Sequence, residues 1–283
     1  MWTAVIRELA ERFPQRKIVL DLEQKPSWWR FRARRALSRP EDAVIFRNNP
    51  RITRLSEIGR GEDPIRLYLD SEANSYFSFT SEEKVVFKPG GHIIRIILGN
   101  FGIEDPRLKC ELFFSSGEKQ RAERLTRDLP PFVVIEPNAK DDFTVNKSWP
   151  FECWQEVVDG LPEDVPVVQV GVAGGRVLRG VADLTGQTTF REAAAIVGRS
   201  RFLLSIEGGL VHAANAVGRP AVVVSGAWAP LEAMAYEENI NLYSRLDCSP
   251  CGLRKPCPRG VECMTSITPQ EVLEAAGEFL AIT

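Results

Sequence analysis

Two consecutive glycines, Gly208 and Gly209, have the residue type and the position that could bind a phosphate group. They follow an apolar segment at residues 202–206, which predicts a buried strand, and they precede a short helical stretch. The first backbone N–H groups of a helix have no partners within the helix, and the helix dipole is positive there, so an anion is favoured. The same glycines also fit a simple tight turn, and the residues alone leave both interpretations open.

Two ionisable side chains near this turn also have a binding and a structural interpretation. Glu207 could contact a ligand, or it could accept hydrogen bonds from the free N–H groups at the start of the helix. His212, one of the two histidines in the chain, could contact a ligand or could pack within its helix. The local pattern therefore suggests a phosphate or nucleotide site and does not require one.

A second group of reactive residues lies in a cysteine-rich segment near the C-terminus. Its cysteines have the spacing C-x₂-C-x₅-C-x₅-C and are Cys248, Cys251, Cys257 and Cys263. Four thiolates on one short loop suit a tetrahedral structural metal, zinc or iron. The alternatives are reduced cysteines that bind nothing and, less expected in the cytoplasm, disulfides.

The elements that must position these residues predict a parallel sheet covered by helices. The strand at 202–206, the helix after it and a second strand at 221–225 form a βαβ unit, whose two strands run parallel. The other predicted strands and helices of this half lie at 131–137, 148–161, 165–171, 190–200 and 268–281. Such alternation is typical of a doubly wound Rossmann-like domain, where ligands bind beyond the carboxyl ends of the strands.

The N-terminal half is less regular, and the composition changes near Asp128. Helices and strands are predicted there at 3–13, 17–22, 44–49, 65–70, 84–90 and 92–101. Between residues 28 and 39, aromatic residues are interleaved with arginines. That segment could form a basic, aromatic face for an anionic acceptor or a membrane surface, or it could be a solvated helix that buries its aromatic residues.

The composition limits the class of protein. The chain has 283 residues, of which 44% are hydrophobic and 26% charged, as in a globular protein with a full core. A net charge of −2 gives no reason to expect a nucleic-acid partner. No run approaches the length of a spanning helix, and the first residues lack the pattern of a signal peptide, so a cytoplasmic location is expected.

The second half of the sequence resembles glycosyltransferase family nine, the ADP-heptose heptosyltransferases of lipopolysaccharide assembly. The first two matching segments are EPNAKDDFTVNKSWP, which ends in a Lys-x-Trp-Pro motif with Lys147, and ADLTGQTTFREAAAIVGRSRFLLSIEGG. The others are EGGLVHAANAVGRP, similar to the family's Asp-Ser/Thr-Gly-x-x-His motif, and the cysteine-rich segment. Together they cover nearly all of residues 132–280 in the expected order.

The resemblance implies an α/β fold of the GT-B type, with two Rossmann-like domains facing across a cleft. Residues 1–128 would form the acceptor-side domain, without its first strand, and residues 129–283 the domain that binds a nucleotide sugar. Lys147 would supply a positive charge to the donor diphosphate, and the backbone N–H groups at the start of the helix would cradle it. The donor-binding residues implied in this way are Lys147, Glu207, Gly208, Gly209, Leu210 and His212.

The sequence departs from the family's pattern at three places. The strand and Gly-Asp loop that precede the first helix in the family, with the presumed general base, have no counterpart, so no catalytic base is assigned. Asp141 and Asp142, in a loop that is a few residues longer than usual, are carboxylates without an assigned role. Glu207 replaces an aspartate and Gly208 a serine or threonine, which leaves the donor undetermined between ADP-heptose and another nucleotide sugar.

Taken together, these observations predict a glycosyltransferase that moves a heptose or related sugar from a nucleotide-sugar donor to a glycan, lipid or protein acceptor. No cofactor is expected for the chemistry, and a structural zinc or iron would occupy the four-cysteine loop. No nucleic-acid partner is expected. Peripheral contact with the inner membrane is expected. The alternatives are a non-catalytic nucleotide-sugar or glycan-binding homologue and a metal-stabilised scaffold in surface-polysaccharide assembly.

Overall fold

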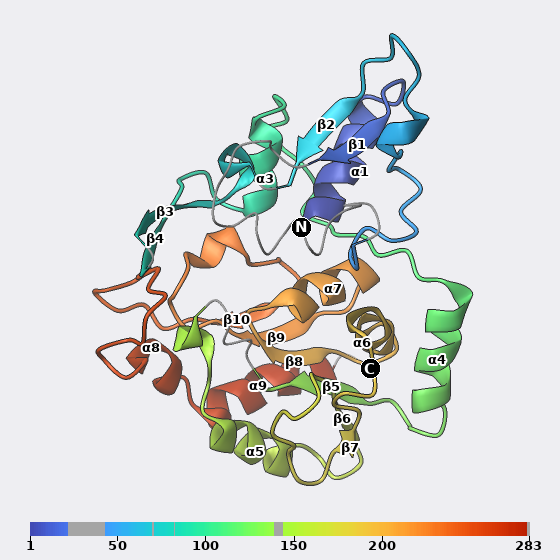
Figure 1. Cartoon of the computed structure of the whole chain (residues 1–283). Coiled ribbons are helices and arrows are strands. Elements are labelled where there is room, and N and C mark those ends of the chain that lie inside the picture. The colour runs from blue at the N-terminus through green and yellow to red at the C-terminus, as the bar shows by residue number, and fades with distance from the viewer. Residues whose placement is uncertain (22–42, 70, 82, 139–143, 282–283) are drawn as a thin grey trace. The chain divides into compact units, whose positions relative to one another are not determined.

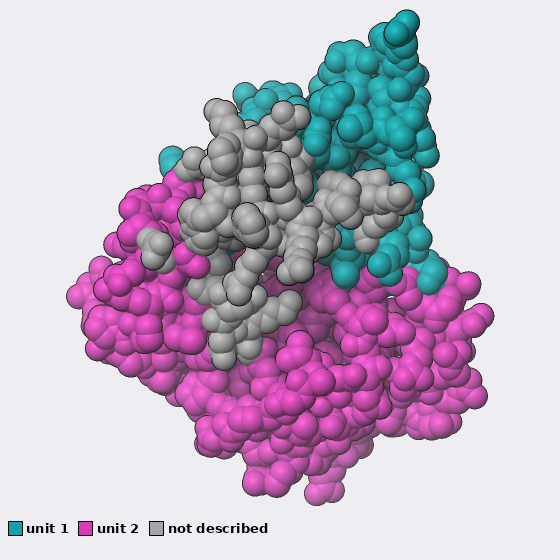
Figure 2. Space-filling view, in the orientation of Figure 1, with its two compact units in different colours: residues 1–76, 89–115 teal, residues 77–88, 116–283 magenta. Residues whose placement is uncertain are grey.

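The computed structural model describes residues 1–21, 43–69, 71–81, 83–138 and 144–281, which are drawn as the coloured ribbon in Figure 1. The chain divides into two compact units (Figure 2). Unit 1 comprises Met1–Tyr76 and Pro89–Ser115, and unit 2 comprises Phe77–Lys88 and Ser116–Thr283. The aromatic and arginine-rich segment at 28–39, together with Asp141 and Asp142, lies outside the described residues.

Unit 2 is built on a six-stranded sheet in the order β10-β9-β8-β5-β6-β7, in which every neighbouring pair is parallel. The strands are β5 (Val133–Glu136), β6 (Val167–Gln169), β7 (Ala182–Asp183), β8 (Leu203–Ile206), β9 (Ala221–Val224) and β10 (Ile240–Leu242). The central strands β8 and β9 are buried at every position. Apart from Ser205, both strands are apolar, as expected where helices cover both faces of a parallel sheet.

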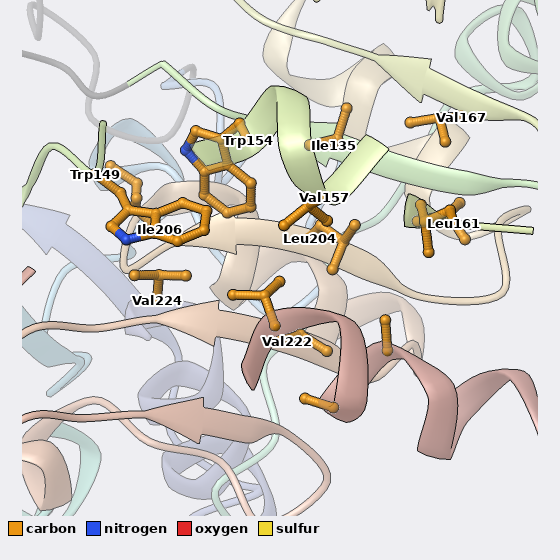
Figure 3. Close-up of a cluster of buried hydrophobic side chains, with 14 of the residues drawn as sticks. Ile135, Trp149, Trp154, Val157, Leu161, Val167, Leu204, Ile206, Val222 and Val224 are labelled. Carbon is orange, nitrogen blue, oxygen red and sulfur yellow. The ribbon is translucent and has the colours of Figure 1, made fainter. Parts of the chain in front are cut away.

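The helices form two layers on the sheet, as Figure 1 shows. The helices are α4 (Ser116–Thr126), α5 (Phe151–Gly160), α6 (Phe190–Val197), α7 (Gly209–Val217), α8 (Glu262–Thr265) and α9 (Pro269–Leu280). Helices α5 and α9 pack together on one face, and α6 lies between α4 and α7 on the other. The α5 side of the core contains Trp149 and Trp154 in edge-to-face contact, with ring centroids 4.7 Å apart (Figure 3).

The order of the strands reverses between β5 and β8. Strands β6 and β7 follow β5 on one side, whereas β8, β9 and β10 follow on the other. In a doubly wound sheet, the crevice beyond the carboxyl ends at such a reversal is where ligands bind. A ligand-binding site is therefore expected at the residues that follow β5 and β8.

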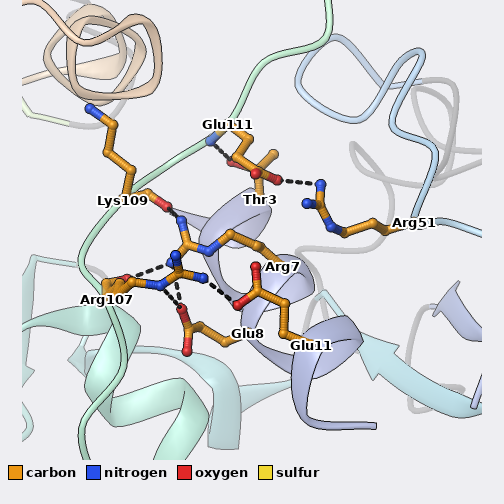
Figure 4. Close-up of polar contacts among 8 residues, drawn as sticks. All are labelled: Thr3, Arg7, Glu8, Glu11, Arg51, Arg107, Lys109 and Glu111. Carbon is orange, nitrogen blue, oxygen red and sulfur yellow. Dashed lines mark hydrogen bonds and ion pairs between the residues drawn. The ribbon is translucent and has the colours of Figure 1, made fainter. Parts of the chain in front are cut away.

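Unit 1 contains helices α1 (Trp2–Arg12) and α3 (Ile93–Gly99) and two parallel strands, β1 (Ile18–Asp21) and β2 (Ile65–Tyr68). A polar network fixes α1 to the extended segment at residues 107–111 (Figure 4). Arg7, which is buried, donates to Glu8 at 2.6 Å and to the carbonyl oxygen of Arg107 at 2.8 Å. The side chains of Arg7 and Arg107 hold the pKa of Glu8 below its ordinary value, although burial opposes this shift.

A hairpin of strands β3 (Phe77–Ser81) and β4 (Lys84–Phe87) belongs to unit 2. It pairs through Lys84 with Leu253 of the cysteine-rich segment, in an antiparallel bridge. Short 3₁₀ turns complete the elements: η2 (Leu55–Glu57), η3 (Glu72–Asn74), η4 (Val145–Lys147) and η5 (Leu231–Ala233).

The observed elements agree with most of the predicted ones and differ at particular places. The strand predicted at 44–49 is wrong: residues 43–48 form turns, and Asn48 has a φ of 63°, which a strand does not allow. Helix α4 and the short strands β3, β7 and β10 were not predicted. Helix α4 packs on α6 and belongs to unit 2. The domain boundary near Asp128 stays a prediction.

Among the described residues, no helix is both long enough and apolar enough to cross a bilayer.

Candidate functional site

The reversal of strand order brings together two residues that the sequence predicted to bind the same ligand. Lys147 ends the 3₁₀ turn η4 in the connection from β5 to α5, and Glu207 directly follows β8. The Nζ atom of Lys147 lies 2.8 Å from Oε2 of Glu207. Both side chains are largely buried, with exposed fractions of 18% and 11%, so the charges interact more strongly than a surface pair would.

An aromatic ring also contacts the ammonium of Lys147. The Nζ atom lies 4.3 Å from the centroid of the Trp228 ring, within the range of a cation–π contact. Trp228 comes from the loop after β9, the strand next to β8, and it is almost completely buried. The carboxyl ends of three neighbouring parallel strands, β5, β8 and β9, therefore lead to the residues around this one positive charge.

The start of helix α7 lies directly beside the ion pair, because Gly208 is its N-cap residue and Gly209 its first residue. Gly208 has extended backbone angles and provides no side-chain cap, so the first N–H groups of α7 receive no cap from it. A Cβ atom on Gly209 would come within 3.3 Å of the Phe190 ring, so a larger residue would require that ring to move. Leu210 is buried, and only its backbone could face a ligand.

His212 makes a contact within unit 2. Its Nδ1 atom shares a hydrogen bond of 2.8 Å with the hydroxyl of Tyr236, and the two rings meet edge to face. Tyr236 is buried, so its hydroxyl is shielded from water in this contact. The described structure thus gives His212 a packing role, and its predicted contact with a donor stays a prediction.

A pocket opens beside Glu207 at the carboxyl ends of β9 and β10. It is small, with an enclosed volume of about 10 Å³, and it is partly open to solvent. The lining is mostly apolar and includes Val223, Ala229, Met234 and Tyr243. Glu207 therefore contacts Lys147 and also borders a small, mostly apolar hollow.

The four cysteines of the predicted metal site lie in the loop between β10 and α9 and in the short helix α8. Cys248 is exposed, and Cys251, Cys257 and Cys263 are partly buried; all four are free thiols. Burial raises the pKa of Cys251 and of Cys263 above the ordinary value of a thiol. Among the described residues, which include all four cysteines, no three histidine, cysteine, aspartate or glutamate side chains gather as a metal ligand set. The other cysteines of the group add to the rise in the pKa of Cys251 and of Cys263, so the four thiols lie within electrostatic range of one another.

Three residues of this region were missed by sequence reasoning: Asn146, Trp228 and Tyr236. Trp228 had a usable signal, because it follows a buried strand of a βαβ unit by a few residues, the position where ligand contacts collect. Asn146 and Tyr236 had none, since only long-range contacts distinguish them from other polar loop residues.

The arrangement suits the binding of a diphosphate. An ammonium group and the free amides of a helix start can donate to phosphate oxygens, and a neighbouring carboxylate can accept from a hydroxyl. Such donors would also stabilise the charge that a leaving nucleotide acquires when a sugar is transferred. No general base for the acceptor is identified among the described residues.

The fold is that of an α/β protein with a doubly wound sheet, and the comparisons with known proteins identify the class. Residues 92–260, more than half of the chain, match the model of glycosyltransferase family 9 (heptosyltransferase). The chain belongs to this family and is a glycosyltransferase. A comparison with curated proteins gives no significant match.

Solved structures with a similar fold are heptosyltransferases and relatives of the GT-B type. One is TibC of enterotoxigenic E. coli H10407, an iron-containing dodecameric glycosyltransferase, with a TM-score of 0.61 and 17% identity over 94% of this chain and 76% of that one. Another is E. coli ADP-heptose lps heptosyltransferase II, with a TM-score of 0.60 and 17% identity over 99% and 94%. A family 9 glycosyl transferase of Veillonella parvula DSM 2008 has a TM-score of 0.56 and 15% identity over 98% and 78%.

Proposed function

We propose that this glycosyltransferase takes its sugar from a nucleotide-diphosphate donor, with ADP-heptose as the first candidate. The observation that carries the proposal is the largely buried ammonium of Lys147 beside the start of α7, at the strand-order reversal of unit 2. The similar enzyme TibC has been solved in complex with ADP-D-beta-D-heptose, which supports this choice of donor.

In the proposed complex, the diphosphate binds between Lys147 and the first N–H groups of α7, contributed by Gly208, Gly209 and Leu210. The carboxylate of Glu207, beside Lys147, accepts from a hydroxyl of the donor. His212 lies on the same helix and is the proposed donor to a phosphate oxygen or a sugar hydroxyl. As the bond from the sugar to the diphosphate breaks, the positive groups stabilise the charge on the leaving phosphate.

The acceptor, a glycan, lipid or protein, stays a prediction from the resemblance. So do the cytoplasmic location, the peripheral contact with an inner membrane and the acceptor role of the N-terminal half. The catalytic base is not assigned.

A structural zinc or iron at Cys248, Cys251, Cys257 and Cys263 also stays a prediction, and it would require the thiols to move together. Elemental analysis of untagged protein, prepared without chelators, measures this. About one zinc or iron per chain that is lost in Cys251→Ser would support the metal site. A metal-free protein that is folded and binds nucleotide would contradict it.

The donor proposal is tested by thermal denaturation of the protein with ADP, UDP or GDP and with their sugars. We expect adenine nucleotides to raise the melting temperature and the others to raise it less, since a ligand that binds only the folded state stabilises it. The variant Lys147→Ala should lose this response. No shift with any nucleotide, in a protein that melts cooperatively, would contradict the proposal.

A further inference from the structure

The carbonyl oxygen of Leu253, in the cysteine-rich segment, is the meeting point of three buried side chains. It accepts from Oγ1 of Thr144 at 3.0 Å, from Nδ2 of Asn146 at 2.9 Å and from Nε1 of Trp228 at 2.7 Å. The exposed fractions of these three residues are at most 4%. Two of the donors lie within three residues before Lys147 in the chain, and the third contacts its ammonium.

Asn146 fixes the chain at the residue before Lys147. Its amide nitrogen donates to the carbonyl oxygens of Leu253 and Lys255, at 2.9 and 2.8 Å, and its amide oxygen accepts from the N–H of Cys257 at 2.9 Å. These bonds use both donors and one acceptor position of the amide. An asparagine can satisfy all three partners, whereas an aspartate lacks the donors and a leucine lacks every polar group.

Trp228 fixes the other end of the lysine side chain. Its ring lies 4.3 Å from Nζ of Lys147, and its indole N–H is held by the Leu253 carbonyl. The backbone that carries Lys147 and the ring that contacts its ammonium are therefore aligned by the same carbonyl oxygen.

The cysteine-rich segment is itself held in place. The carbonyl of Gly252 accepts from the N–H of Val85 at 3.0 Å, and the N–H of Arg254 donates to the backbone carbonyl of Glu83 at 2.7 Å. Residues 252–254 therefore extend the β3–β4 hairpin. Gly252 has a φ of +60°, and a Cβ atom there would lie 2.3 Å from the carbonyl oxygen of Val85. Only glycine allows this close approach.

We propose that Asn146 and Trp228 are positioning residues for Lys147, and that the cysteine-rich segment supports them through the carbonyl of Leu253. The proposal rests on the proposed donor site, in which Lys147 binds the diphosphate. A lysine side chain has four flexible carbons and loses much conformational freedom when it is held in one place. Groups that hold it before the donor arrives reduce that loss on binding, and so increase the affinity.

The test compares ADP affinity, measured by calorimetry, in Asn146→Ala and Trp228→Phe. The second variant keeps an aromatic ring near the ammonium and removes the indole N–H, although the ring is also smaller than that of tryptophan. We expect each variant to bind ADP about three- to tenfold more weakly, the range of one or two lost hydrogen bonds. In a Lys147→Ala background the same changes should alter the affinity by less than about twofold, because the effect acts through Lys147.

A matched control is Asn239→Ala. This change also removes an amide that bonds to the backbone, since Asn239 accepts from the N–H of Ala221 at 2.9 Å, but at the amino end of β9. It should lower the melting temperature without changing ADP affinity. Folded Asn146→Ala and Trp228→Phe variants that bind ADP as tightly as the wild type, or that lose as much affinity without Lys147, would overturn the proposal.

A second measurement does not depend on the donor site. Acylation of lysine amines, followed by mass spectrometry, gives the reactivity of Lys147 relative to that of the exposed Lys119. We expect this ratio to rise severalfold in Asn146→Ala and Trp228→Phe and to stay unchanged in Asn239→Ala. If the wild-type protein binds no nucleotide, the donor proposal fails, and an unchanged ratio in the two variants overturns the positioning proposal separately.

Discussion

At the scale of single residues, the ion pair between Lys147 and Glu207 affects how strongly the site attracts a negatively charged ligand. The carboxylate lies 2.8 Å from the ammonium and so reduces its attraction for a diphosphate. In the proposed complex, this carboxylate also accepts from a hydroxyl of the donor sugar. Glu207 should therefore distinguish a nucleotide that carries a sugar from one that does not.

This predicts opposite responses in two variants. Lys147→Ala should weaken ADP binding by about 1.5–3 kcal/mol, the contribution of a charge-assisted hydrogen bond. Glu207→Gln should strengthen ADP binding severalfold, because the neutral amide no longer offsets the ammonium, and should weaken the preference for the sugar nucleotide over ADP. Calorimetry with ADP and with the sugar nucleotide measures both changes.

The exposed Lys119, on α4, provides the control for the loss of a positive charge. Lys119→Ala should leave both affinities unchanged. A Glu207→Gln variant that binds ADP more weakly than the wild type would contradict the account of the ion pair given above.

At the scale of elements, one buried pair attaches α4 to the sheet-covering helix α6. The guanidinium of Arg191 donates from Nε and Nη2 to the two carboxylate oxygens of Glu118, at 2.5 and 3.1 Å. Arg191 is 2% exposed, so its charge has almost no access to water. This contact accounts for the inclusion of α4 in unit 2, which the composition of the sequence did not indicate.

We expect Glu118→Ala to destabilise unit 2 by about 3 kcal/mol, because a buried guanidinium that loses its carboxylate is costly. Urea denaturation measures the change. The matched control is Glu152→Ala, which breaks a pair with Arg176 on the surface, where water already screens the charges; little change is expected there. Equal effects of the two substitutions would show that the burial of Arg191 does not determine the loss in free energy of unfolding.

At the scale of the whole molecule, a buried histidine makes stability depend on pH. His92 caps helix α3 by accepting from the N–H of Ile94 at 3.2 Å, and burial lowers its pKa from 6.5 to about 4, with a smaller contribution from nearby positive charge. The unfolded chain takes up a proton near pH 6.5 and the folded one only near pH 4. The contribution of neutral His92 is therefore fully present above pH 6.5 and is lost as the pH falls towards 4.

The expected loss is on the order of 3 kcal/mol of unfolding free energy across this range. Urea denaturation at a series of pH values measures it for unit 1, which contains His92. His92→Asn keeps a capping acceptor and removes the titration, so its stability should vary less with pH over the same range. A variant with the wild-type pH dependence would assign that dependence to other groups.

The sequence by itself determined the α/β class and most elements of unit 2, and it predicted the chemical character of the site. Short apolar runs that alternate with helical segments favour buried strands, and a Gly-Gly turn between such a strand and a helix leaves free amides where a phosphate could bind. The strand predicted at 44–49 failed because local composition does not reveal that Asn48 adopts a turn conformation. The four cysteines suggested a metal, but their spacing does not determine whether the thiols converge.

Only the tertiary structure decided which of these residues meet. Lys147 and Glu207 are far apart in the sequence and become neighbours because β5 lies next to β8 at the strand-order reversal. The adjacent β9 adds Trp228, and the hairpin-supported cysteine-rich segment adds the carbonyl of Leu253. Strand order depends on how helices pack over the two faces of the sheet, which is a property of long-range contacts and not of any local pattern.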